Sequence, residues 1–184
     1  YEISLGLVGS EMCIRDRIGI EGTAILAKEK EAVLRERYSQ PFIDKAKELD
    51  RYISVLSEAA TAVKSGVAAM HDVTEGGIFG ALWEIAEASG VGLEIDLKKI
   101  PLKQETVEIC EFFGINPYEL ISSGSMLMAA EDGNGLVMEL EKAGIPAVVI
   151  GKATDSNDRV LLNEEERRFL EPPKTDELYK ALSK

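Results

Sequence analysis

An apolar run that ends in polar residues and two adjacent glycines constrains the fold of this chain more than any other stretch. Residues 67–70 are apolar and predict a short strand, and a helical pattern over residues 81–88 follows the polar turn directly. The start of a helix leaves backbone N–H groups free, and glycines allow a ligand to approach the backbone closely. Strand, glycine turn and helix in this order are typical of an anion-binding site.

The polar residues of this turn allow two interpretations. No Lys or Arg lies between His71 and Gly80 to hold a phosphate. Asp72 and Glu75 are compatible with a carboxylate beside a metal-bound phosphate. The alternative is a tight connection from strand to helix, in which Thr74 or Asp72 caps the first turn of the helix. The residues of the turn leave both interpretations open.

Length and composition narrow the class of protein. The chain has 184 residues, which suffices for one domain with its own core. The net charge of −12 argues against binding of nucleic acid or of an anionic membrane surface. No apolar run approaches the roughly 20 residues that span a bilayer. The two cysteines, Cys13 and Cys110, lack the spacing of a zinc site, and two cysteines are too few for a disulfide framework. We therefore expect a cytoplasmic protein.

Helical and strand patterns alternate along the chain. Helices are predicted at residues 24–35, 42–49, 55–64, 78–89, 104–113, 136–143 and 176–182, and strands at 67–70, 91–97, 126–130, 147–151, 160–162 and 167–170. The last two strands form a hairpin. This alternation predicts an α/β fold in which helices flank a mixed sheet.

A second polar loop precedes the strand at residues 126–130. Ser122, Ser123, Gly124 and Ser125 could present hydroxyl and backbone N–H donors to a ligand. The alternative is a plain connector between a helix and a strand. Cys110 is expected to be a small core residue, because no His or Lys near it in the sequence would lower its pKa.

Residues 1–17 resemble a translated sequencing-library adapter. Residues 12–17 correspond to the translation of a transposase end sequence, and residues 7–11 continue the match upstream in the same frame. We therefore expect this segment to be non-native and to lie outside the fold. A cleaved leader is the alternative, but no basic region precedes the apolar stretch. The domain is then expected to comprise residues 18–184.

The turn also carries a family resemblance. The stretch His71-Asp72-Val73-Thr74-Glu75-Gly76-Gly77 and residues 84–92 resemble the C-terminal domain of the aminoimidazole ribonucleotide (AIR) synthetase superfamily, in particular its hydrogenase-maturation HypE type. Residues 19–24 are similar to the linker into this domain, and residues 151–154 and the final hairpin to its last strands. The likeness covers nearly all of residues 18–184.

This resemblance implies an ATP-dependent enzyme of two domains, usually a homodimer. In the superfamily, an N-terminal domain supplies most ligands of ATP and magnesium, and we expect this domain to be missing from the chain. The C-terminal domain closes over the phosphates with its glycine turn. The residues that match the family's site are Asp72, Thr74, Gly76 and Gly77, with Asp72 as the candidate magnesium ligand and Ser123 and Gly124 as weaker candidates.

The chain also departs from the hydrogenase-maturation pattern. Those enzymes end in a tail with a cysteine that accepts a carbamoyl group, whereas residues 179–184 contain none. A related enzyme with another substrate is therefore one expectation. A non-catalytic partner or regulatory protein that keeps the fold is the alternative. For the chain alone we expect no ATP turnover, and an exposed apolar face where the missing domain would pack.

Overall fold

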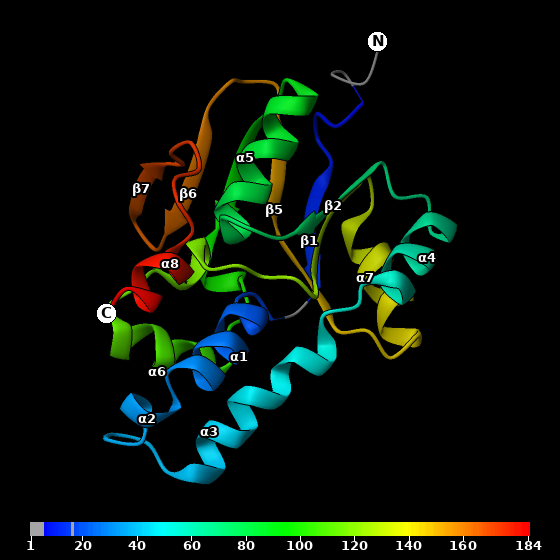
Figure 1. Cartoon of the computed structure of the whole chain (residues 1–184). Helices are drawn as coiled ribbons and strands as arrows, with labels where there is room; N and C mark the ends of the chain where they lie inside the picture. The colour runs from blue at the N-terminus through cyan, green and yellow to red at the C-terminus, as the bar shows by residue number, and fades with distance from the viewer. Residues whose placement is uncertain (1–5, 16) are drawn as a thin grey trace.

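A seven-stranded mixed sheet forms the centre of the computed structural model, which describes residues 6–15 and 17–184 (Figure 1). The strands follow the spatial order β2-β4-β1-β5-β3-β6-β7. All neighbouring pairs are antiparallel except β3 and β6, which are parallel. The strands are β1 (Glu11–Arg15), β2 (Ala69–Val73), β3 (Gly92–Asp96), β4 (Ser125–Ala130), β5 (Ala147–Thr154), β6 (Arg159–Asn163) and β7 (Glu166–Phe169).

Helices cover both faces of the sheet, and a further group of helices packs together beyond one end of it (Figure 1). The α-helices are α1 (Ile20–Glu29), α2 (Glu31–Leu34), α3 (Gln40–Lys47), α4 (Leu56–Lys64), α5 (Gly77–Ser89), α6 (Gln104–Phe113), α7 (Gly133–Lys142) and α8 (Glu177–Leu182). Short 3-10 helices are η1 (Glu48–Tyr52), η2 (Leu97–Lys99) and η3 (Pro117–Glu119). Among the described residues, no helix has the length and apolar character that crossing a membrane requires.

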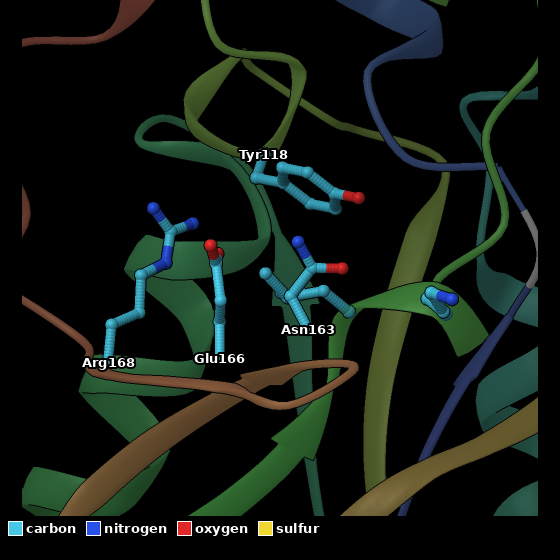
Figure 2. Close-up of a pocket in the computed structure, with 6 residues that line it drawn as sticks. Tyr118, Asn163, Glu166 and Arg168 are labelled. Carbon is cyan, nitrogen blue, oxygen red and sulfur yellow. The ribbon is translucent and has the colours of Figure 1, made fainter.

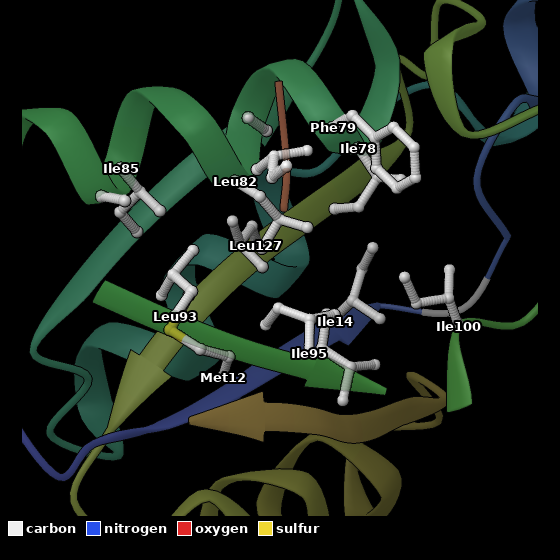
Figure 3. Close-up of a cluster of buried hydrophobic side chains, with 14 of the residues drawn as sticks. Met12, Ile14, Ile78, Phe79, Leu82, Ile85, Leu93, Ile95, Ile100 and Leu127 are labelled. Carbon is white, nitrogen blue, oxygen red and sulfur yellow. The ribbon is translucent and has the colours of Figure 1, made fainter. Parts of the chain in front are cut away.

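The buried side chains form three main clusters. The largest lies between α5 and one face of the sheet, where Leu82 and Leu127 are fully buried (Figure 3). A second cluster packs α4 and α7 against the opposite face, and it includes Met128 and Leu140. The third joins α1, α3, α6 and α8 to one another. Strand β4 is buried along all six residues because helices cover both of its faces.

Strand β1 lies in the middle of the sheet, between β4 and β5. Met12 and Ile14 pack into the cluster beneath α5, whereas Cys13 joins the cluster on the other face. For residues 11–15, this placement corrects the expectation that the segment lies outside the fold, whereas residues 1–5 and 16 are not among the described residues. The alternating apolar side chains suit a strand buried on both faces, and pairing on both sides satisfies the backbone groups of β4 and β5. The adapter origin of the segment is a separate matter and stays a prediction.

Candidate functional site

The two polar loops identified in the sequence lie side by side at one edge of the sheet. Val73 at the end of β2 pairs with Ser125 at the start of β4. The backbone carbonyl of Thr74 accepts the N–H of Gly77 at 3.1 Å and the N–H of Ser122 at 3.3 Å. One oxygen therefore joins the glycine turn (residues 72–77) to the serine loop (residues 122–125), although about fifty residues separate them in the chain.

Asp72, like Glu75, is an exposed carboxylate of this edge. Within residues 6–15 and 17–184, no hydrogen bond or ion pair engages its side chain. Its neighbour His71 is held in place, because the ring Nε2 lies 3.0 Å from the Glu84 carboxylate and Nδ1 lies 2.6 Å from the Asp72 carbonyl oxygen. Over the described residues, no group of three or more His, Cys, Asp or Glu side chains is placed to hold a metal. Asp72 would thus be a single protein ligand that needs others from elsewhere.

Gly76 and Gly77 both adopt left-handed backbone conformations, with φ of 82° and 62°. The N–H of Gly76 donates to the Asp176 carboxylate at 2.7 Å, and the N–H of Gly77 donates to the Thr74 carbonyl. A Cβ at Gly77 would lie 2.5 Å from the Tyr118 carbonyl oxygen. These contacts explain the glycines by backbone conformation and close packing. A phosphate oxygen could accept a hydrogen bond from either N–H only after the present hydrogen bond of that N–H is broken.

Asp176 is a residue of this site that the sequence indicated only as the start of a terminal helix. It is 2% exposed and accepts backbone hydrogen bonds from Gly76 at 2.7 Å and from Leu178 at 2.8 Å. Burial raises the pKa of the Asp176 carboxyl above its ordinary value, and the backbone groups of Leu178, Gly76 and Ile121 act in the opposite direction. An Asp before the terminal helix signals an N-cap, but nothing in the sequence signals its contact with the glycine turn.

The serine loop is also tied to its surroundings by the backbone. The N–H of Ser123 donates to the Glu21 carboxylate at 3.2 Å. Gly124 has a φ of 98°, and a Cβ there would lie 2.4 Å from the Tyr52 carbonyl oxygen. Gly124 therefore allows η1 to pack closely against the loop. Ser123 itself is half-buried, and it follows Ser122, whose N–H contacts the glycine turn.

The two cysteines are core residues. Burial raises the pKa of the Cys110 thiol to about 12, with Glu177 acting in the same direction. Burial likewise raises the pKa of Cys13 to about 12, and Glu11 and Asp132 contribute. Neither thiol is exposed, which confirms the expectation that Cys110 packs in the core.

A cavity of about 220 Å³ lies between η2, η3 and the hairpin of β6 and β7, and the sequence did not indicate it. Figure 2 shows Tyr118, Asn163, Glu166 and Arg168 around it. The Tyr118 ring stacks on Phe79, with ring centroids 5.2 Å apart. Because the Tyr118 backbone also packs on the glycine turn, this residue connects the cavity to the candidate site.

Comparison with known sequences assigns the family. The model of the family described as AIR synthase related protein, C-terminal domain, matches residues 4–163. A putative hydrogenase expression/formation protein of Methanocaldococcus jannaschii is 31% identical over 167 residues, which are 86% of this chain and 50% of that protein. A carbamoyl dehydratase HypE of Rhizobium leguminosarum bv. viciae is 29% identical over 147 residues, which are 78% of this chain and 40% of that protein.

Solved structures support the same fold. The crystal structure of E. coli HypE, a hydrogenase maturation protein, matches 98% of this chain and 55% of its own with a TM-score of 0.77 at 20% identity. HypE in complex with ATP matches 96% of this chain and 54% of its own with a TM-score of 0.68 at 17% identity. The chain thus spans about half the length of these relatives, and the predicted mixed α/β sheet is confirmed. This chain belongs to the AIR synthase related family and corresponds to its C-terminal domain.

Proposed function

We propose that the chain is the C-terminal part of an ATP-dependent enzyme of the HypE type. In this proposal, the edge formed by the glycine turn and the serine loop closes over ATP phosphates that a further domain binds. Family membership supports it, as does the span of about half the length of the relatives. One of the structures with the same fold is a complex with ATP.

The observation that carries the proposal is the junction of the two loops at the Thr74 carbonyl. It brings the exposed side chains of Asp72 and Thr74 to the edge where the half-buried Ser123 lies. The Thr74 and Ser123 hydroxyl groups can donate hydrogen bonds to phosphate oxygens. Asp72 can bind Mg²⁺, which typically takes one or two protein carboxylates together with phosphate oxygens and water.

The chemistry of phosphoryl transfer suits such an edge. It depends on positioned charge and on donors that stabilise the transition state, and it requires no nucleophile from the protein. The protonated, buried thiols of Cys13 and Cys110 are compatible with this requirement. Bound magnesium would neutralise charge on the phosphates, and Asp72 would hold it or orient a donor.

The test is ATP turnover by a longer protein in which the native upstream sequence precedes Ile18. We expect turnover by this protein, none by the present chain, and a large loss in Asp72→Ala. Full activity of Asp72→Ala would reject the role of Asp72. Hydrolysis of ATP by the present chain would contradict the need for a further domain.

A non-catalytic binding protein is the second candidate, and one observation favours it. The Asp176 carboxylate already satisfies the N–H of Gly76, so the turn is closed by a group of the chain itself. A binding protein of this kind would be stabilised thermally by phosphate or ATP without turning it over. Measuring the melting temperature of the longer protein with and without ATP, next to turnover, separates the two candidates.

A further inference from the structure

We propose that Asp176 is a positioning residue, through which the C-terminal segment (residues 170–184) holds the glycine turn and the serine loop together. Its effect on ATP rests on the function proposed above, whereas its effect on the two loops does not. The geometry makes this segment a structural part of the candidate site.

The Asp176 carboxylate joins two parts of the backbone. One oxygen accepts the N–H of Gly76 at 2.7 Å, and the other accepts the N–H of Leu178 at 2.8 Å. The backbone of Ile121, directly before the serine loop, also lowers the pKa of this carboxyl. Hydrogen bonds to an ionised acceptor are about twice as strong as neutral ones. A single buried group therefore links the glycine turn to α8, and the Thr74 carbonyl joins this turn to the serine loop.

Other contacts of the segment lie on the same turn. The negative charge of the nearby Glu75 carboxylate raises the pKa of the exposed Tyr179 hydroxyl. Pro173 lies near Gly76 and Gly80, within 4 Å of the Cβ position of each. The glycine turn is thus contacted both by residues that precede α8 and by a residue of α8 itself. Asp176 is the buried residue among them.

The far side of α8 is anchored in the core. Leu178 is 8% exposed and Ala181 is fully buried in the cluster that contains Ile109 and Cys110 of α6. Figure 1 shows α8 beside α6, with the glycine turn at the start of α5 nearby. Because α8 is fixed on this side, the Asp176 carboxylate has a defined position from which to hold the turn.

Removing the negative charge is expected to loosen both loops. Asparagine keeps the shape of the side chain but replaces one acceptor oxygen by an NH₂ donor, which cannot accept a backbone N–H. Gly76 has a left-handed conformation that glycine leaves readily, so its position depends on such contacts. The connection of Gly76 to the start of α8 would then be lost.

The experiment compares amide hydrogen exchange by NMR in the full 184-residue chain and in two variants. Asp176→Asn is expected to increase exchange at Gly76 by about tenfold or more, as for a lost hydrogen bond to a charged group. It should also shift the resonances of Ser122. The control is Asp132→Asn, because Asp132 caps α7 through the N–H of Gly135 at 2.8 Å. The control should leave Gly76 unchanged.

A measurement on the unsubstituted chain keeps the proposal testable if Asp176→Asn does not fold. A scalar coupling across the hydrogen bond between the Gly76 nitrogen and the Asp176 carboxyl carbon is expected. Absence of this coupling, or Gly76 exchange in Asp176→Asn within about twofold of the unsubstituted chain, would overturn the proposal.

Kinetics of the longer protein test the link to ATP. Asp176→Asn is expected to raise KM for ATP by about tenfold. Asp132→Asn is expected to leave KM unchanged, even if it lowers the melting temperature by the same amount. An unchanged KM of Asp176→Asn would remove Asp176 from the ATP site. If the longer protein shows no turnover at all, the proposed function fails, and the NMR result still decides whether Asp176 holds the loops.

Discussion

Replacing Gly77 by alanine should destabilise the fold more than the same change at another left-handed glycine. The φ of 62° costs alanine about 1–2 kcal/mol. The new Cβ would also lie 2.5 Å from the Tyr118 carbonyl oxygen and 2.8 Å from that of Leu120. Both are backbone atoms that cannot rotate away, so overpacking adds about 1–3 kcal/mol. The expected loss of unfolding free energy is therefore about 2–5 kcal/mol.

Gly66→Ala is the matched control, because Gly66 has a φ of 75° and its Cβ position has no atom within 4 Å. This variant should lose only the conformational share, about 1–2 kcal/mol. Urea unfolding followed by circular dichroism measures both variants, provided that the m-values agree. If Gly77→Ala is no more destabilised than Gly66→Ala, the close approach between the glycine turn and η3 is wrong.

Three further outcomes follow from burial and charge. Neither Cys13 nor Cys110 should react with a thiol reagent at pH 8 in the native chain, since burial raises both pKa values to about 12; rapid labelling of Cys13 alone would show that β1 does not form. A carboxyl NMR titration of Glu31 should have its midpoint near pH 2, because hydrogen bonds from Lys47 and Gln40 lower its pKa, and Lys47→Met should return it toward 4.5. Its contribution to stability is then present above pH 4.5 and lost as the pH falls toward 2; an unshifted midpoint would contradict the contact. Leu56→Ser should reduce self-association in light scattering, because Leu56 is 80% exposed; a monodisperse monomer before substitution would contradict this.

The glycine turn could be predicted because its signals are local. The apolar strand, the paired glycines and the helix that follows lie within about twenty residues, and Gly90, in a left-handed conformation, ends α5 where the helix predicted at residues 78–89 stops. The mixed α/β class followed from the alternation of patterns. The predicted helix at residues 24–35 is instead divided into α1 (Ile20–Glu29) and α2 (Glu31–Leu34), because the backbone of Lys30, with φ of −114° and ψ of 22°, leaves the helical conformation.

The remaining features depend on contacts that periodicity does not encode. The hydrogen bond from Gly76 to Asp176 spans 100 residues of sequence, so the capping signal of Asp176 pointed only to its own helix. The parallel pairing of β3 with β6 is likewise a property of the assembled sheet. Strand β1 was missed because its adapter resemblance removed it from consideration, although its side chains alternate as a buried strand requires.

The central claim is that the joined loops form the phosphate-facing edge of an ATP site. Calorimetric titration of ATP into the longer protein tests it, with Thr74→Val as the variant. Thr61→Val on α4 is the control, because its hydroxyl only contacts the Ser57 carbonyl. We expect Thr74→Val to weaken ATP binding by about tenfold or more and Thr61→Val to leave it unchanged. Equal affinity of Thr74→Val, of Ser123→Ala and of the unsubstituted protein would contradict the claim.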